Sequence, residues 1–294
     1  MANTPNTAIW NAASEYVQGL RLTYATTTTF TVDQGAARDS TNNNDIILSL
    51  PPLNDGTPVL TPFTIRTTVN GAGGLDVGTI AASTLYYVYV IASSNSKINL
   101  PPSPILSQTI PPFAPAPPSA PVQQDGYYVQ ANVMISTSST APVLPFGYDM
   151  FRRIGAVSTN GSSQFRKFVQ TGYGANRTMW YDAGVSVLAA GAAQAYATID
   201  VVSAGLVAQL LPSSALETLL QVTFTPAAVG NSVSFQPFGG TGAYATLSAV
   251  AVQAQSSQLR CPAGLNALVP VINYQNSAAA CATSVLIQGY VDQL

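Results

Sequence analysis

The chain has 294 residues, of which 7% are charged and none is histidine, and its formal net charge at pH 7 is −2. Ten cationic residues without a dense basic cluster argue against nucleic-acid binding, which needs a strongly basic face. The lack of histidine excludes a Ser-His-Asp or Cys-His nucleophile system within this chain and argues against a zinc enzyme.

Residues 1–20 predict an N-terminal arm or docking segment. Apolar residues between Ala8 and Leu22 recur at a helix-like spacing, and Asn6–Thr7 supplies capping residues. A short helix and an extended polar arm that docks on a neighbour both fit this pattern. Residues 1–10 contain neither Lys nor Arg and no continuous apolar run, so they do not resemble a secretory signal.

Strand signals dominate the region before residue 137. The segments concerned are rich in β-branched or alternating apolar residues and are bounded by Pro, Gly or Asn. They are Thr23–Val32, Asp45–Leu50, Phe63–Val69, Leu85–Ala92 and Tyr127–Ser136. The Gly-rich loop Asn70–Gly74 requires positive φ angles. Leu85–Ala92 is apolar on both faces, which predicts a strand covered on both sides, either within a sandwich or against a partner subunit.

Residues 101–121 contain nine prolines, the clearest break in composition along the chain. A rigid polyproline II linker or recognition segment is one interpretation. An ordered loop across one end of a sandwich is the other, and the strand-like run Ser103–Ile110 inside the segment favours it.

The region from Asp149 to Val169 predicts a β-hairpin, because the turn-prone Thr159–Ser162 separates two strand-like runs. Neighbouring cations in each run point to opposite faces, so one face presents two of them. Such a face is a candidate contact for an acidic partner subunit or an anionic glycan; ion pairs with Asp149 or Asp182 are the alternative. The four cations are Arg152, Arg153, Arg166 and Lys167.

Trp180 and Tyr181 form a candidate sugar-stacking platform, because aromatic faces pack against the C–H groups of sugar rings. Burial of these rings in the protein core is the alternative.

From Ala197 onward the chain contains only strand signals, separated by Gly, Pro, Asn or Ser. The predicted strands are Thr198–Val202, Leu219–Phe224, Val233–Phe235, Ala245–Val252, Asn266–Ile272 and Ser284–Val291. This spacing predicts an all-β fold of antiparallel β-sandwich or jelly-roll-like domains. A boundary near Leu211–Pro212 gives a β-sandwich domain over 21–211, which includes the Pro-rich loop 101–121, and a C-terminal β-rich domain over 212–294. One large sandwich with a long insertion is the alternative. The apolar region Val185–Leu211 contains polar residues and glycines, and predicts buried strands rather than a membrane span.

Cys261 and Cys281 are the only cysteines in the chain. A disulfide between them would close a loop of about 20 residues and stabilise the fold by about 3 kcal/mol on the chain-entropy model. The missing secretory signal favours synthesis in a reducing compartment and therefore two buried free thiols.

No catalytic, metal-binding or cofactor-binding residue is predicted. Many of the acidic residues stand in turn-like segments, where an Asp side chain stabilises the turn through hydrogen bonds to nearby backbone. The segment Asp39–Asp45 offers oxygen ligands that suit calcium, but it lacks the D-x-D-x-D-G spacing of a calcium loop. A carboxylate pair that cleaves polysaccharide is the weakest functional hypothesis.

Several segments form a combination that points to a known family. They are Asp39–Asp45, Val69–Ile80, Tyr86–Ile91 and Leu144–Gly155, followed by the Ser158–Gly161 turn and Phe165. In combination they resemble virion structural proteins of tailed bacteriophages. The resemblance covers roughly residues 19–168 and implies a particle component of fibre, spike or decoration type, often trimeric and without catalytic residues. The C-terminal third resembles the β-rich ends of such proteins by composition only.

We therefore expect a non-enzymatic structural subunit of the virion, made in the cytoplasm of the host bacterium. It is expected to assemble with copies of itself, most simply as a trimer, and with other virion proteins on the head or tail. Low charge suits packing between copies, because few charges must be desolvated. The alternative is a receptor-binding module that recognises a host-surface glycan. Neither hypothesis involves nucleic acid, membrane insertion or a cofactor.

Overall fold

The structure is a computed structural model that describes residues 16–49, 62–94, 131–199, 209–262, 264–266 and 269–294. Every element whose bounds lie within these residues is a strand, and all the pairings between strands are antiparallel. The all-β prediction is confirmed. The Pro-rich segment 101–121 lies outside the described residues. Among the described residues there is no helix with the length and apolar character that a membrane span requires.

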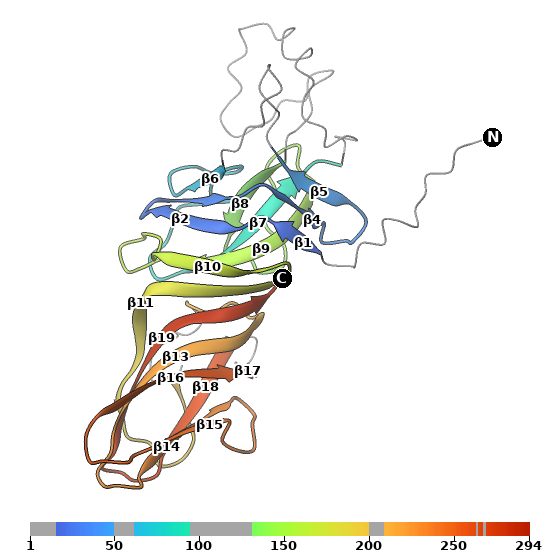
Figure 1. Cartoon of the computed structure of the whole chain (residues 1–294). Helices are drawn as coiled ribbons and strands as arrows, with labels where there is room; N and C mark the ends of the chain where they lie inside the picture. The colour runs from blue at the N-terminus through green and yellow to red at the C-terminus, as the bar shows by residue number, and fades with distance from the viewer. Residues whose placement is uncertain (1–15, 50–61, 95–130, 200–208, 263, 267–268) are drawn as a thin grey trace, which may run out of the picture.

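The largest sheet contains eight strands and runs along most of the molecule (Figure 1). Its order across the sheet is β16 (Gln255–Pro262), β13 (Ala215–Thr225), β19 (Ala282–Gln293), β11 (Asn176–Gly191), β10 (Phe168–Tyr173), β2 (Leu22–Thr26), β3 (Thr29–Val32) and β6 (Phe63–Arg66).

Three smaller sheets complete the fold. The β7 sheet has the order β8 (Asn132–Ser136), β7 (Leu85–Ala92) and β9 (Met150–Ser158). The β1 sheet has the order β1 (Val17–Gly19), β4 (Gly35–Arg38) and β5 (Asp45–Leu48). The β18 sheet has the order β12 (Ala197–Thr198), β18 (Val269–Asn276), β14 (Ser232–Pro237) and β15 (Ala245–Ser248), with β17 (Gly264–Asn266) paired to β18.

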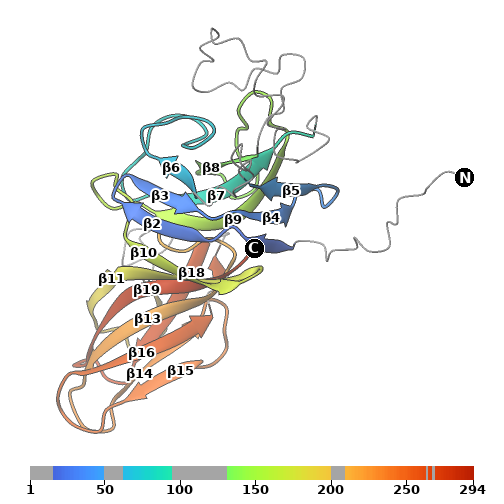
Figure 2. The ribbon, with the colours of Figure 1, turned by 45° about the horizontal axis from the view of Figure 1, so that its top comes forward.

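The β7 sheet and the β18 sheet pack on one face of the eight-stranded sheet, so the molecule has sandwich layers at both ends (Figure 2). The β1 sheet instead extends strands β2 and β3, since Leu20 hydrogen-bonds with Gln34 and Arg21 with Asp33 between the two strand pairs, and its β5 contacts β7 and β9. The β7 sheet lies behind β2 and β10, and the β18 sheet lies behind β13 and β19. A single apolar cluster fills the space between the layers and includes Phe30, Val88, Val222 and Phe235. Burial of this apolar surface is the main stabilising contribution to the fold.

Strand β11 joins the two ends of the molecule. Its first six residues pair with β10, and the strand as a whole pairs with β19. The eight-stranded sheet therefore contains strands from both sides of Leu211–Pro212, where the sequence predicts a domain boundary.

Strand β7 is buried on both faces, as its continuous apolar sequence predicts. Tyr86 belongs to the large apolar cluster. Tyr89 faces the other way into a second cluster, where the Phe151 ring meets it edge-on at 5.8 Å. The cover on both sides comes from this chain itself. The predicted positive φ angles in the Gly-rich loop are also confirmed, at Gly71 and Gly73.

The predicted N-terminal helix is wrong for the residues that the structure describes. Val17–Gly19 form β1 and Leu22 begins β2, while residues 1–15 lie outside the described ranges. Gly19 and Leu20 have φ angles of 67° and 53°, and two such residues in succession turn the chain out of any right-handed helix.

The predicted strand Thr23–Val32 is two strands joined by a tight turn. The hydroxyl groups of Thr26 and Thr29 lie 2.7 Å apart, and the Thr28 amide donates a hydrogen bond to the Thr26 hydroxyl. These side-chain bonds close the turn between β2 and β3, which β-propensity alone does not reveal.

The predicted hairpin over 149–169 is confirmed only beside its turn, where Thr159 and Phe165 form an antiparallel bridge; the pairing expected between the two longer runs is wrong. Strand β9 pairs with β7, whereas β10 pairs with β2 and β11. Between them, the Asn160 side chain accepts hydrogen bonds from the amides of Ser162 and Gln164 and closes a loop. The buried Phe165 ring then meets Phe30 edge-on at 5.0 Å, which anchors the chain on the eight-stranded sheet.

Cys261 and Cys281 are both buried and both free. The disulfide that the sequence left open as an alternative is not formed. Burial raises the pKa of the Cys261 thiol to about 12, with a smaller contribution from the negative charge of Glu217. A thiol with so high a pKa is an inert member of the core.

Candidate functional site

One row of residues crosses six adjacent strands of the eight-stranded sheet. Successive residues of a strand alternate between faces, and the neighbours of Trp180 in the chain, Met179 and Tyr181, are buried in the core. The row therefore lies on the opposite face, which we call the outer face. In register across the strands, it consists of Thr23, Val169, Trp180, Gly289, Leu219 and Arg260.

A hollow of about 240 Å³ lies on the outer face beside the half-buried Trp180. Gly289 stands between Trp180 and Leu219 in the row. Polar side chains line the same hollow, namely Gln258, Arg260 and Gln288. The arrangement combines an apolar aromatic surface with amide groups that both donate and accept hydrogen bonds.

The polar groups around this hollow are held by contacts with their neighbours. The Gln288 amide donates a hydrogen bond of 2.9 Å to the side-chain oxygen of Gln221. The Arg260 guanidinium lies 3.6 Å from the carboxylate of Glu217. The hydrogen bond orients the Gln288 amide, whereas the Arg260 side chain is 62% exposed and its ion pair is weak.

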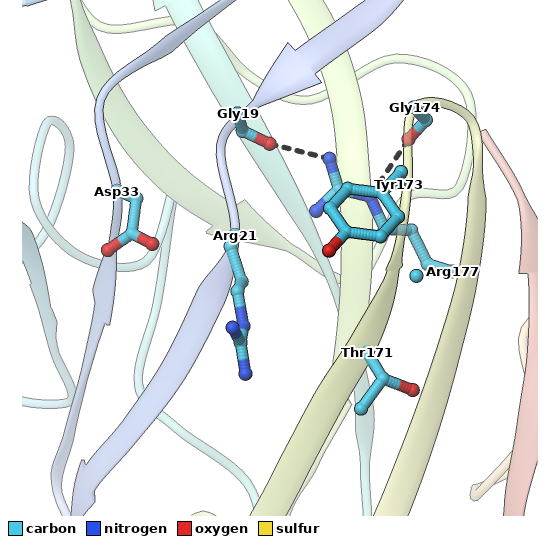
Figure 3. A pocket seen from close by; sticks show the side chains of 8 residues that line it. Gly19, Arg21, Asp33, Thr171, Tyr173, Gly174 and Arg177 are labelled. Carbon is cyan, nitrogen blue, oxygen red and sulfur yellow. Dashed lines mark hydrogen bonds between the residues drawn. The ribbon is translucent and has the colours of Figure 1, made fainter.

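A larger hollow of about 450 Å³ lies where β2 meets β10, close to the turn between β10 and β11 (Figure 3). Thr171 and Tyr173 alternate with Phe168 and Gln170 along β10, so they share the outer face with Val169. Tyr173 is 95% exposed. The lining residues are Gly19, Arg21, Asp33, Thr171, Gly172, Tyr173, Gly174 and Arg177.

Arg177 lies at the buried side of this hollow, is only 3% exposed and links the segments that form its wall. Its guanidinium donates hydrogen bonds to the carbonyl oxygens of Gly19, Leu20 and Gly174 and to the side chain of Gln170. Burial, and then the positive charge of Arg21, lower its pKa. Arg177 thus ties the segment before β2 to the β10–β11 turn.

Arg21 and Asp33 differ from Arg177, because neither side chain has a hydrogen-bond or ion-pair partner among the described residues. Figure 3 shows Arg21 between Asp33 and the strand that carries Thr171, with the Tyr173 ring at the other end of the hollow. The guanidinium of Arg21 is therefore available to a ligand.

The four cations of the predicted hairpin do not form one basic face. The Arg153 guanidinium lies within the fold, 3.3 Å from the buried carboxylate of Asp292. Arg152 is half-buried on the same strand. Lys167 pairs with Asp182 at 3.1 Å, which confirms the ion-pair alternative for that residue, and both residues line a third hollow of about 230 Å³ with Arg166. The cations separate because β9 and β10 belong to different sheets.

Trp180 and Tyr181 do not form a joint platform, because they are consecutive in a strand and point to opposite faces. The Tyr181 hydroxyl donates a hydrogen bond of 2.6 Å to the carbonyl oxygen of Leu210 in the core. Trp180 alone remains on the outer face. Sequence reasoning missed Arg21 and Tyr173, although a tyrosine between Gly172 and Gly174 indicates an exposed turn.

Comparisons with known proteins identify no family. No protein-family model matches the chain, and no curated protein matches it. Among solved structures, it is similar to a carbohydrate-binding module of Cellvibrio mixtus lichenase 5A in complex with cellotriose. The two chains are 16% identical, the similarity covers 44% of this chain and 87% of the module, and the TM-score is 0.20. A likeness at this level carries no argument about function.

Proposed function

We propose that this chain is a saccharide-binding subunit of a tailed-phage virion and that it contacts host-surface glycan through the outer face of its eight-stranded sheet. The observation that carries the proposal is the position of Trp180, half-buried in the middle of the outer-face row and beside a hollow lined by Gln258, Arg260 and Gln288.

The chemistry of this hollow suits a sugar ring. A pyranose has an apolar face of C–H groups and a rim of hydroxyl groups, so it needs an aromatic surface together with hydrogen-bonding groups at its edge. Trp180 supplies the first, and the two glutamine amides supply donors and acceptors without a net charge. An open sheet face also leaves room for the rest of a long polymer. Binding without cleavage is the proposed outcome.

The virion setting is supported by the resemblance of residues 19–168 to phage structural proteins and by the low charge of the whole chain. Fourteen tyrosines and abundant uncharged polar residues suit contacts between copies. We propose a homo-oligomer, most simply a trimer. Mass determination of the purified chain tests this part: a 30.5 kDa monomer at micromolar concentration argues against self-assembly. Detection of the chain in purified particles, with its copy number, tests the virion assignment.

Saccharide binding is tested by a glycan array probed with the wild-type chain and with Trp180→Ala. Removal of the indole is expected to weaken binding about tenfold or more, because buried aromatic contacts dominate such interfaces. Tyr244→Ala is a matched control, since Tyr244 is 55% exposed but lies on the loop between β14 and β15, outside the outer face. Equal binding by Trp180→Ala and the wild type, or release of cleaved products, contradicts the proposal.

A further inference from the structure

The hollow between Arg21 and Tyr173 differs from the hollow beside Trp180 in the state of its arginine: Arg260 lies beside Glu217, whereas the Arg21 side chain has no hydrogen-bond or ion-pair partner among the described residues. We infer that it is a subsite for a carboxylate-bearing sugar residue, so that the saccharide recognised by this chain is an acidic one; this inference rests on the proposed function. The subsite would hold the carboxylate on Arg21 and the ring on Tyr173.

The charges around the hollow favour a single carboxylate. Two arginines, Arg21 and Arg177, and one aspartate, Asp33, line the hollow, in a chain whose net charge is −2. The Arg177 guanidinium donates its hydrogen bonds to acceptors of the protein itself, whereas the Arg21 side chain has no hydrogen-bond or ion-pair partner among the described residues. A guanidinium matches a carboxylate through two parallel hydrogen bonds. The negative charge of Asp33 repels a doubly charged phosphate more strongly than a singly charged carboxylate, and its oxygens accept hydrogen bonds from sugar hydroxyl groups.

Tyr173 supplies the stacking surface that a sugar ring needs. Its side chain is 95% exposed and follows Gly172, whose φ of 97° allows the turn that presents the ring. A Cβ atom at Gly172 would lie 2.4 Å from the carbonyl oxygen of Asn176, so the turn depends on glycine there. The Thr171 hydroxyl, on the same face of β10, offers a further hydrogen bond to the ligand.

The subsite and the hollow beside Trp180 share no lining residue, but both open on the outer face. Strand β10 links them, because Val169 pairs with Trp180 while Thr171 and Tyr173 lie further along the same strand at the subsite. Four residues separate Val169 from Tyr173, a distance of roughly 13 Å at the rise of a β-strand. A short oligosaccharide spans this length, with neutral residues at Trp180 and an acidic residue at Arg21.

The test uses an array that pairs each carboxylate-bearing glycan with the same glycan methyl-esterified, and measures binding of the full chain at low salt. The wild type is expected to prefer the acidic form about tenfold, and the preference is expected to shrink as salt rises. Arg21→Gln is expected to abolish the preference while it retains binding of the esterified form. Arg66→Gln removes a cation from the same sheet, outside both hollows, and is expected to keep the preference.

The outcomes separate this inference from the proposed function. Binding that depends on Trp180 but does not distinguish the acid from its ester overturns the acidic subsite alone. A preference that survives in Arg21→Gln also overturns it, as does an equal loss of both forms in that variant. If neither form binds, or if Trp180→Ala binds both as well as the wild type does, the proposed function fails as well.

Discussion

The hydroxyl of Tyr290 on β19 donates a hydrogen bond of 2.9 Å to the carbonyl oxygen of Ala156 on β9. Both residues are buried, and they belong to different sheets. The bond therefore crosses the core between the eight-stranded sheet and the β7 sheet. It also satisfies a backbone oxygen in a place that water does not reach.

Tyr290→Phe keeps the ring and removes only this hydroxyl. It is expected to lower the free energy of unfolding by about 1–2 kcal/mol, because the Ala156 carbonyl oxygen loses its side-chain donor in a buried setting. Equilibrium unfolding in urea measures the change. Tyr244→Phe removes an exposed hydroxyl and is expected to leave stability unchanged. Equal stability of Tyr290→Phe and the wild type contradicts the assigned role of the bond.

Arg153 and Asp292 form an ion pair inside the fold, and Asp292 is 2% exposed. Ser214 donates a further hydrogen bond of 2.6 Å to the same carboxylate oxygen. Burial raises the pKa of Asp292, although Arg153 and Ser214 partly oppose this shift. The pair therefore depends on each partner to offset the desolvation of the other.

Arg153→Met leaves the Asp292 carboxylate buried without its counter-charge and is expected to cost about 3–5 kcal/mol at pH 7. Adding Asp292→Asn to that variant is expected to recover part of the loss, because the remaining group is then neutral. Urea unfolding of the two single variants and the double variant gives the coupling energy. Strictly additive effects of the two substitutions would mean that the residues do not interact.

The strands with strong apolar patterns could be predicted from the sequence, but their partners could not. β7, β13, β14 and β19 all include the residues expected of them. β16 was missed because its outer positions are polar and exposed, as in Ser256, Gln258 and Arg260, and its inner positions are only moderately apolar. The pairing of β9 with β7 rather than β10 depends on long-range packing, which local turn signals do not report.

The residues of the candidate site also could not be brought together from the sequence, because their positions depend on which strands pair. The period of two residues in a strand implies that Trp180 and Tyr181 point to opposite faces, but the sequence does not reveal which face is covered. The Arg21 hollow combines a residue beside β2 with Thr171 and Tyr173 on β10, far along the chain. Only the pairing of β2 with β10 brings these side chains together.

Asp39 stabilises the loop between β4 and β5 in its ionised form. Its carboxylate accepts hydrogen bonds from the amides of Asn43 and Asn44 and from the hydroxyl of Thr41. Burial alone raises the pKa of Asp39, but these bonds outweigh it, and the pKa is lowered. The loop uses the oxygens that the sequence offered as calcium ligands, while Asp45 pairs with Arg38.

Because the folded pKa of Asp39 lies below its unfolded value, its stabilising contribution is present above the unfolded pKa and is lost as the pH falls through the folded pKa. Asp39→Asn is expected to cost about 1–3 kcal/mol at pH 7, and less at pH values where the wild-type carboxyl is protonated. Unfolding measured as a function of pH checks this. Asp182→Asn, at an exposed ion pair, is the control with a small effect. A cost that stays constant with pH contradicts the assignment.

Gly289 is required by the close approach of β19 to β11 at the centre of the outer face. A Cβ atom at this position would lie 2.0 Å from the carbonyl oxygen of Met179, and both atoms belong to rigid strand positions. Gly289→Ala is therefore expected to lower the free energy of unfolding by about 1–3 kcal/mol and to displace Trp180, which pairs with Gly289.

The matched control for Gly289→Ala is Gly242→Ala, because a Cβ atom at Gly242 meets no atom within 4 Å. That variant is expected to stay within about 0.5 kcal/mol of the wild type. Urea unfolding gives the stabilities, and the emission spectrum of Trp180, recorded in a Trp10→Phe background, reports the displacement of the indole. An unchanged emission spectrum together with wild-type stability in Gly289→Ala would show that β19 and β11 are less closely apposed than their register requires.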